Sequence, residues 1–368
     1  MIYLGLMSGT SCDGIDAALV NIDDSGIECL ATYHEVYPNK LKTILLSVIA
    51  GKAASARLFS NLDCQLATCY AQVVKSILSQ ANVRPEQVQA IGLHGQTIDH
   101  NPPVNTWQLG SAAHVAALTG IDVIADFRSL DVAYGGQGAP LAPALHKEVF
   151  YQGKPLAVLN LGGIANLSYI TEQRVIGFDT GPANCLMDLW ANKHLQIDYD
   201  QSGLWAAKGV VCDDLLQALL SEPYFSNRPP KSTGRELFHL KWLEKHLADL
   251  ETLSPQDIQA TLLALTVMTI SNDVDTYAAD ASQLIVCGGG VHNTTLMSQL
   301  EKQLHMPVIS SQSVGVNPDH VESVLMAWLA SKYQDPLDLI QITGSKVAHR
   351  FGVLYKGKVE TKSKEADS

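Results

Sequence analysis

Residues Leu4–Ile22 read LGLMSGTSCDGIDAALVNI, in which two apolar runs flank a loop of Gly, Ser, Thr and Asp. A strand, a polar turn and a second strand form the pattern of a β-hairpin. Hydroxyl groups and exposed backbone N–H groups bind phosphate oxygens, whereas the carboxylates of Asp13 and Asp16 would repel phosphate unless a metal ion lay between them. The stretch therefore predicts either an ordinary hairpin or one that holds phosphate together with a metal ion.

The second half of the chain opens in the same way. PLAVLNLGGIANLSYI, at 155–170, is again an apolar strand, a glycine turn and an apolar strand. Two such openings predict two similar lobes that face each other across a cleft, although two hairpins in a chain this long also arise by chance. The Gly/Pro-rich stretch at 133–143 is the best candidate for the boundary, so we expect lobes at 1–133 and 134–355 and a polar tail at 356–368.

Bulk composition excludes several classes of protein. The chain has 368 residues, 46% of them hydrophobic, and a formal net charge of -12. An acidic protein is a poor candidate for nucleic-acid binding, which depends on clustered Lys and Arg. The seven cysteines contain no C-x-x-C pair, which favours free thiols in a reducing compartment. No basic segment precedes the apolar N-terminal run, and no apolar run reaches the roughly 18 residues that span a bilayer. We expect a cytoplasmic protein with no nucleic-acid or membrane partner.

Coarse patterns place the elements around these loops. The first 36 residues favour an antiparallel meander of three strands, and helical periodicity follows. VQAIGLHGQT, at 88–97, predicts a strand that ends in a polar turn, and SAAHVAALTG predicts a helix that Gly120 ends. VIGFDTGPANCLMDLW, from Val175, predicts a strand, a turn at Gly181 and Pro182, and a helix. In NPDHVESVLMAWLA, Asn317 is a candidate helix cap.

The familiar phosphate-binding signatures are missing from the sequence. G-x-x-x-x-G-K-[ST] does not occur, and neither glycine cluster gives G-x-G-x-x-G between a strand and a helix. What remains is an ordered set of four motifs: SGTSCDGID at 8–16, NLGGIAN at 160–166, GFDTGP at 177–182 and CGGGVHN at 287–293. This order resembles the sugar kinase, Hsp70 and actin superfamily, in which two phosphate hairpins and an adenosine motif surround ATP.

Further motifs are MSGTSCDGIDAAL, HGQT at 94–97, DFR at 126–128 and GFDTGPAN. Together with the four motifs above, they make the chain resemble the anhydro-N-acetylmuramic acid kinase family from Leu4 to about Leu329. Cys12 departs from the aliphatic residue expected there, and a small thiol should pack similarly. The resemblance implies an α/β, two-lobed actin-like ATPase (ribonuclease H-like) fold, with mixed sheets, flanking helices and duplicated lobes around a nucleotide cleft. It also implies ATP and Mg²⁺ as cofactors, a homodimer, and a role in bacterial cell-wall recycling.

The resemblance also implies roles for individual residues. Asp179 is the implied catalytic base and also contacts the sugar, and Asp13 is the implied magnesium ligand. Thr97, Arg128 and Glu322 are the implied sugar-binding residues. The implied nucleotide-binding residues are Gly9, Thr10, Ser11, Cys12, Asp13, Gly14, Ile15, Asp16, Asn160, Gly162, Gly163, Asn166, Gly288, Gly289, Gly290 and Asn293.

Each role has a purely structural alternative. Asp179 would instead cap the following turn or helix, and Asp13 and Asp16 would satisfy their own turn. A carboxylate such as Glu322 is favoured at a helix start in any case. Arg128 suits bidentate recognition of the sugar's lactyl carboxylate, but it also suits an ion pair with Asp126 or Asp131. His94, a lone histidine at a strand end, is interpreted as a hydrogen-bonded structural residue.

The implied reaction couples hydrolysis to phosphoryl transfer. In a 1,6-anhydro sugar O6 is bound to C1, so no 6-hydroxyl is available. Asp179 would deprotonate a water that attacks C1, and the released O6 would take the γ-phosphoryl group of ATP. The rival interpretations are an ordinary hydroxyl-directed sugar kinase, a sugar-sensing repressor and an Hsp70-like or actin-like ATPase. A repressor would need a helix-turn-helix module, and the first strand is expected to start at Ile2; an ATPase machine would need extra domains or inserts.

Overall fold

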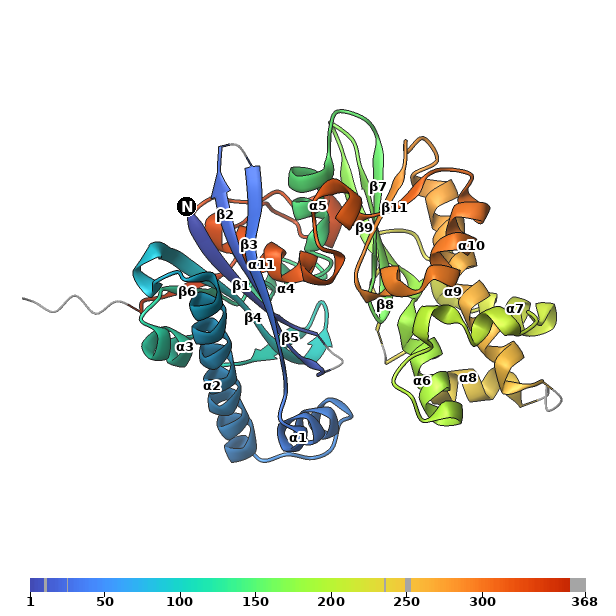
Figure 1. Cartoon of the computed structure of the whole chain (residues 1–368), viewed down its shortest axis with the longest axis horizontal. Helices are drawn as coiled ribbons and strands as arrows, with labels where there is room; N and C mark the ends of the chain where they lie inside the picture. The colour runs from blue at the N-terminus through green and yellow to red at the C-terminus, as the bar shows by residue number, and fades with distance from the viewer. Residues whose placement is uncertain (10–11, 25, 235, 249–252, 358–368) are drawn as a thin grey trace, which may run out of the picture. The chain divides into compact units, whose positions relative to one another are not determined.

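The computed structural model of the chain describes residues 1–9, 12–24, 26–234, 236–248 and 253–357 (Figure 1). The chain divides into two compact units. Unit 1 comprises Met1–Gly138, Glu322–Asp338 and the residues from Lys346 onward, and unit 2 comprises Ala139–Val321 and Leu339–Ser345. The first segment of unit 1 ends at Gly138, five residues beyond the expected boundary at 133. Unit 1 also includes two segments from the C-terminal part of the chain, whereas the sequence analysis expected each lobe to be one continuous range.

Unit 1 is built on a seven-stranded sheet with the order β12-β6-β4-β1-β2-β3, and β5 pairs with β4. Its strands are β1 (Ile2–Ser8), β2 (Gly14–Asp23), β3 (Gly26–Val36), β4 (Val88–Asn101), β5 (Asn105–Leu109), β6 (Val123–Ala125) and β12 (Val353–Tyr355). Its helices are α1 (Asn39–Ile49), α2 (Ala56–Ala81), α3 (Ala112–Thr119), α4 (Ser129–Ala133) and α11 (Val321–Ser331). The core lies between this sheet and its helices, with α2 and α3 contributing much of the apolar cluster.

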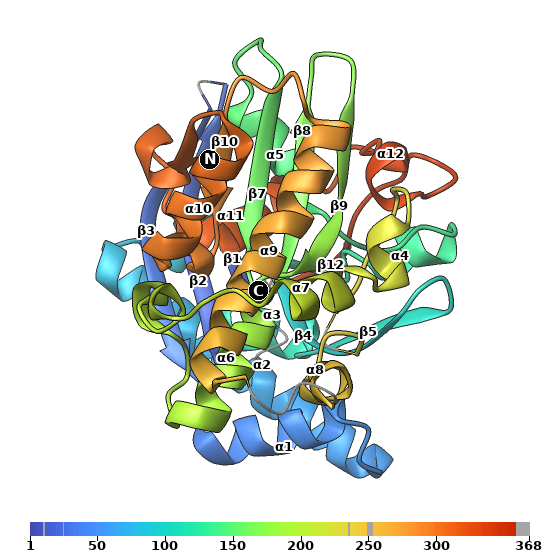
Figure 2. The same ribbon diagram turned by 90° about the vertical axis from the view of Figure 1, so that its right-hand side faces the viewer.

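Unit 2 is built on a five-stranded sheet with the order β11-β10-β7-β8-β9. Its strands are β7 (Leu156–Leu161), β8 (Ile164–Ile170), β9 (Val175–Pro182), β10 (Leu284–Cys287) and β11 (Val308–Ser310). Its helices are α5 (Ala142–Phe150), α6 (Asn184–Leu195), α7 (Asp213–Leu220), α8 (Leu240–Leu247), α9 (Pro255–Tyr277), α10 (Thr294–Leu304) and α12 (Ile340–Thr343). Figure 2 shows α9 running along the sheet, where it contacts β8 and β9.

The two sheets repeat one topology. In unit 1 the meander β1-β2-β3 is antiparallel, and β4 and then β6 add parallel to β1. In unit 2 the meander β7-β8-β9 is antiparallel, and β10 and then β11 add parallel to β7. The α/β class with mixed sheets and flanking helices, expected from the sequence, is confirmed, and the repeated hairpin pattern marks a repeat of the whole sheet.

Local capping chemistry explains where several helices begin and end. Ser55 caps α2 by accepting the backbone N–H of Leu58 at 3.2 Å, and Ser254 caps α9 with Pro255 as its first residue. Helix α3 ends at Gly120, which has φ 71° and supplies the left-handed C-cap that the sequence predicted. Such signals lie within a few residues of the helix end, and of these three the Gly120 stop was predicted from the sequence.

Two strands run further than the sequence indicated. Strand β4 continues through Thr97 to Asn101, because its end pairs with β5 in a second hairpin. Strand β9 includes Gly181 and Pro182, because Gly181 pairs with Ala165 of β8 where a turn was expected. Both predictions of a turn were therefore wrong, and Asp179 lies inside β9, three residues before its last residue.

A pair of glycines lets α11 rest directly on the sheet of unit 1. Gly5 of β1 and Gly92 of β4 are neighbours in the parallel register. A Cβ atom at Gly5 would lie 1.8 Å from the carbonyl oxygen of Ser323, and one at Gly92 would lie 1.9 Å from that of Met326. The backbone of α11 therefore occupies the space that two side chains would take, and this contact fixes the helix that carries Glu322.

We expect Gly92→Ala to lower the free energy of unfolding by about 2–3 kcal/mol, because the added methyl forces the α11 backbone away from the sheet. Denaturant unfolding of both proteins measures the difference. Gly289→Ala is the control, because a Cβ atom there meets no atom within 4 Å. An equal loss of stability in both variants would contradict the close contact.

Candidate functional site

The loop after β1 is held at its base by hydrogen bonds inside unit 1. The buried Ser8 hydroxyl donates to the Gly95 carbonyl at 3.2 Å and also hydrogen-bonds to the Tyr70 hydroxyl. Gln96 of the HGQT motif donates its Nε2 to the Gly9 carbonyl at 3.0 Å. The first loop and the HGQT segment are therefore one structural group. The predicted ligands Thr10 and Ser11 lie outside the described residues.

The side chains of Cys12 and Ile15, two of the predicted nucleotide-binding residues, are buried in the core of unit 1. Cys12 is fully buried in the apolar core, which confirms that the thiol packs as an aliphatic side chain would. Its backbone has φ 55°, and its N–H donates to the Gly9 carbonyl at 3.2 Å. Ile15 is also buried, and a Cβ at Gly14 would lie 2.3 Å from the Glu35 carbonyl oxygen. Any contact of Gly14 or Ile15 with a nucleotide would involve backbone atoms.

Asp13 and Asp16 each contact a basic side chain within unit 1. Lys42 Nζ lies 2.7 Å from Asp13 Oδ1, and His34 Nδ1 lies 2.8 Å from Asp16 Oδ1. Across the described residues no group of three or more His, Cys, Asp or Glu side chains could hold a metal ion. Mg²⁺ bound to phosphates keeps several waters and needs only one or two carboxylates. The Asp13 side chain, 62% exposed, fits that kind of site and not one built by protein ligands alone.

Arg128 is oriented by a neutral histidine. Its Nε donates to His94 Nε2 at 2.9 Å, and its Nη1 donates to the Gly138 carbonyl at 2.5 Å. His94 Nδ1 lies 2.7 Å from the Gly95 carbonyl, so Nδ1 carries the proton and Nε2 is the acceptor. Burial, followed by the charge of Arg128, lowers the pKa of His94 to about 3. The interpretation of His94 as a hydrogen-bonded structural residue is confirmed.

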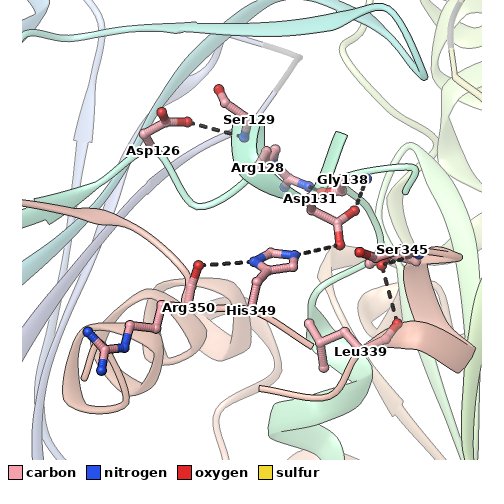
Figure 3. Close-up of polar contacts among 10 residues, drawn as sticks. Asp126, Arg128, Ser129, Asp131, Gly138, Leu339, Ser345, His349 and Arg350 are labelled. Atoms are coloured by element: carbon pink, nitrogen blue, oxygen red, sulfur yellow. Dashed lines mark hydrogen bonds and ion pairs between the residues drawn. The ribbon is translucent and has the colours of Figure 1, made fainter. Parts of the chain in front are cut away.

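A second buried contact holds the loop that Arg128 touches. Asp131 is fully buried, and its Oδ2 accepts the Gly138 N–H at 2.7 Å. Its Oδ1 lies 3.2 Å from His349 Nε2, and His349 Nδ1 lies 3.0 Å from the Arg350 carbonyl (Figure 3). Gly138 is therefore held at its N–H by Asp131 and at its carbonyl by Arg128, which fixes the plane of the guanidinium. Asp126, the other suggested partner, accepts the Ser129 N–H at 3.2 Å.

The remaining sugar-binding candidates of unit 1 lie on β4 and α11. Gln108 Nε2 donates to Thr97 Oγ1 at 3.3 Å, across the β4–β5 pair. Glu322 is half-buried in the first turn of α11. Sequence reasoning missed Gln96, Asp131 and His349 as supports of this group. Gln96 stands inside a quoted motif, but Asp131 and His349 are 218 positions apart and share no local pattern.

The hairpin loop of unit 2 is held by the start of α6. The backbone N–H groups of Ala183 and Cys185 both donate to the Gly163 carbonyl at 3.0 Å. Asn184 donates to the Gly162 carbonyl through its backbone N–H at 3.1 Å and through its side chain at 2.9 Å. The carbonyl groups of Gly162 and Gly163 thus face α6.

The glycine motif at 287–293 packs against the end of β7. Gly288 has φ 83°, and a Cβ there would lie 2.4 Å from Asn160 Oδ1; one at Gly290 would lie 2.5 Å from the Leu161 Cβ. A Cβ at Gly289 would meet nothing within 4 Å, so this position leaves room for a flat group to approach the backbone. Asn293 caps α10 by accepting the Leu296 N–H at 3.0 Å.

Asp179 lies on β9 directly opposite Asn166 of β8. Its Oδ2 accepts the Thr233 N–H at 3.0 Å, and its own N–H donates to the Lys231 carbonyl at 3.1 Å. Helix α6 begins after Ala183 with no side-chain cap, so Asp179 does not cap it. Asn166 Oδ1 is buried and has no hydrogen-bond partner among the described residues. The Asp179 carboxylate and the unpartnered amide oxygen of Asn166 thus lie on neighbouring strands.

Comparison with known proteins covers almost the whole chain. A family model described as anhydro-N-acetylmuramic acid kinase matches residues 1–357. The chain is 44% identical over 366 residues to the anhydro-N-acetylmuramic acid kinase of Xylella fastidiosa, with 96% of each chain covered. It is 44% identical over 364 residues to that of Vibrio vulnificus, covering 96% of this chain and 98% of that one.

The chain belongs to the anhydro-N-acetylmuramic acid kinase family.

This membership confirms the family expected from the quoted motifs. Among solved structures, component A of the (R)-2-hydroxyglutaryl-CoA dehydratase of Acidaminococcus fermentans is similar over 89% of this chain and 96% of that chain, with a TM-score of 0.49 and 11% identity. In the described part of this family member, no helix has both the length and the apolar character to cross a membrane.

We expect His94 to make the protein less stable in acid. Its pKa is about 3 when folded and 6.5 when exposed, so between these values the unfolded chain binds a proton that the folded chain does not. Stability should therefore fall as the pH falls below 6.5, and His94→Gln, which keeps an acceptor for Arg128, should lose less. Denaturant unfolding on either side of this pH measures the slope.

The slope should not vanish in His94→Gln, since burial also lowers the pKa of His146 to about 3. Equal slopes in the wild type and in His94→Gln would contradict a neutral His94.

Proposed function

We propose that this chain uses ATP to convert 1,6-anhydro-N-acetylmuramic acid into N-acetylmuramate 6-phosphate and ADP, with water opening the anhydro bridge. Membership of the family supports the substrate and the reaction. The observation that carries the chemistry is the Asp179 carboxylate, which lies inside β9, accepts the Thr233 N–H and does not cap α6. We propose that the enzyme serves recycling of cell-wall sugars.

Asp179 is the proposed general base. It takes a proton from water, and the water oxygen forms a bond to C1 of the sugar. The C1–O6 bond breaks and leaves its electron pair on O6, which then forms a bond to the γ-phosphorus as ADP leaves. Glycosidases need a second carboxyl group to protonate the departing oxygen, but here the phosphoryl group captures it. Asp179 finally returns its proton to solvent.

Nucleotide binding is assigned to the two hairpin loops and the glycine motif. Gly9, Thr10 and Ser11 are proposed to contact the β- and γ-phosphates from unit 1, and Gly162, Gly163 and Asn166 from unit 2. Gly288, Gly289 and Gly290 are proposed to border the adenosine, with the open position at Gly289 in support. Asp13 would hold Mg²⁺ together with phosphate oxygens and water, and the ion would offset the charge that develops during phosphoryl transfer.

Arg128 is proposed to bind the lactyl carboxylate of the sugar. Its guanidinium is held by the imidazole of His94 and the carbonyl of Gly138, both uncharged acceptors. A guanidinium presents paired N–H donors that match a carboxylate, and a fixed plane reduces the entropy lost on binding. Thr97 and Glu322 are proposed to contact the sugar as well.

The cellular setting and assembly remain proposals taken from the resemblance. We propose that the protein works in the cytoplasm, in line with its cysteine pattern, and as a homodimer. Light scattering after size-exclusion chromatography would give twice the chain mass of 39.7 kDa for a dimer.

We expect that incubation with ATP, Mg²⁺ and the anhydro sugar in ¹⁸O-labelled water gives a sugar phosphate that carries the label at C1. Mass spectrometry after rapid reduction of the product measures the label, and preformed product kept in the same water gives the background exchange. Asp179→Asn should form no sugar phosphate and still bind ATP in calorimetry. A sugar phosphorylated only when it has a free 6-hydroxyl would favour the ordinary kinase, and ADP without sugar phosphate would favour an ATPase.

Arg128→Ala should raise the KM for the sugar about tenfold to a hundredfold, because a charge-assisted contact with the carboxylate is lost. The KM for ATP should change by less than about threefold. Arg84→Ala removes an exposed arginine of unit 1 and should change neither constant. Equal increases of both constants in Arg128→Ala would contradict a role as the sugar anchor.

A further inference from the structure

A buried ion pair in unit 2 has no part in the proposed chemistry. The Lys231 side chain is 3% exposed, and its Nζ lies 3.4 Å from Asp273 Oδ2, which α9 supplies. The same Nζ lies over two aromatic rings, 5.4 Å from the centroid of Phe178 and 5.2 Å from that of Tyr224. Burying an ammonium group is costly unless it is paired, so these contacts confine Lys231 closely.

The backbone of Lys231 covers the open edge of the strand that bears Asp179. Among the strands of the described residues, β9 is the outer strand of its sheet, so its outward N–H groups have no neighbouring strand there to bond. The Asp179 N–H donates to the Lys231 carbonyl at 3.1 Å, and the Thr233 N–H donates to Asp179 Oδ2 at 3.0 Å. The Tyr224 hydroxyl adds a hydrogen bond to the Asp179 carbonyl at 2.8 Å.

The segment at 231–233 connects the ion pair to Asp179, because Lys231 contacts Asp273 with its side chain and Asp179 with its backbone carbonyl. Phe178 of β9 lies on the α9 side of the sheet, where its ring centroid is 5.0 Å from that of Tyr277. Thr180 lines a cavity of about 340 Å³ together with Asp273, on the α9 side. The Lys231 ammonium contacts the Phe178 ring on that side, while its carbonyl binds Asp179 at the strand edge.

We propose that Lys231 and Asp273 form a positioning pair that holds Asp179 in place for proton abstraction. The pair anchors the segment from Tyr224 to Thr233, and that segment supplies backbone or hydroxyl contacts to the N–H, carbonyl and carboxylate of Asp179. This inference rests on the proposed role of Asp179. Lys231 touches the base through its backbone, so it is a positioning residue and not a catalytic one.

Burial raises the pKa of Asp273 to about 6, even though Lys231 acts to lower it. Removing Lys231 alone would leave this carboxyl group buried without its cation, which destabilises the fold as well as the segment. A single substitution thus cannot separate positioning from stability. Replacing both Lys231 and Asp273 with apolar side chains leaves no unpaired charge in the interior. Such double replacements are often neutral or stabilising.

The test compares Lys231→Met, Lys231→Met/Asp273→Leu and Lys231→Arg. We expect kcat to fall about tenfold to a hundredfold in the single and in the double variant, because a small displacement of a reacting group has effects of this size. Both KM values should stay within about threefold. The double variant should regain thermal stability without regaining kcat, and Lys231→Arg should recover part of kcat. Recovery of kcat together with stability in the double variant would overturn the positioning role.

Tyr169→Phe is the matched control. It removes a hydrogen bond to Asp280 of 2.7 Å, made by the partly buried Tyr169 hydroxyl on β8 of the same sheet. Strand register places Tyr169 opposite Ile176, away from Asp179. This variant should leave kcat unchanged. A loss of kcat in Tyr169→Phe equal to that in the double variant would mean that any weakening of the sheet lowers turnover, and would overturn the proposal.

Hydrogen exchange gives a readout that does not depend on the chemistry. The peptide that contains 176–182 should exchange faster in the double variant than in the wild type or Tyr169→Phe. If Asp179→Asn keeps its turnover, the assignment of the base is wrong, while faster exchange in the double variant would still show that the pair holds this strand end. Unchanged exchange with normal kcat would overturn the positioning pair and leave the proposed function intact.

Discussion

The contact between α11 and the glycines of β1 and β4 governs the organisation of unit 1. Gly5 and Gly92 are register neighbours, and carbonyl oxygens of α11 lie where their side chains would be. Because only glycine permits so close an approach, a helix from the far end of the chain is built into the sheet that begins with Ile2. The chain therefore leaves unit 1 after residue 138 and returns to it at Glu322.

Arg128 is oriented by two uncharged acceptors of unit 1. His94, whose pKa is lowered to about 3, and the Gly138 carbonyl hold it with uncharged acceptors. Asp131 accepts the Gly138 N–H and lies 3.2 Å from His349 Nε2, so it holds the loop that Arg128 contacts. Together these contacts fix the plane of the Arg128 guanidinium.

The sequence predicted what local patterns encode. The two hairpins, the helix stop at Gly120 and the glycine motif at 287–293 follow from turn and capping chemistry within a few residues. The turn at Gly181 was wrong because Gly181 pairs with Ala165 in the β8–β9 ladder, and the presence of a glycine does not by itself distinguish a strand from a turn. Asp131–His349 and Lys231–Asp273 join elements far apart in the chain, so only the fold brings them together.

The edge position of β9 explains why Asp179 needs such long-range support. A central strand would hold its backbone from both sides, but its side chains would be enclosed by neighbours on the same face. An outer strand exposes one side of each residue and leaves its N–H groups without a ladder partner. At Asp179 the segment at 231–233 supplies that partner, with a carbonyl for the N–H and an N–H for the carboxylate. Accessibility of the carboxylate and rigidity of its backbone are thus provided by different parts of unit 2, and the fold must specify both.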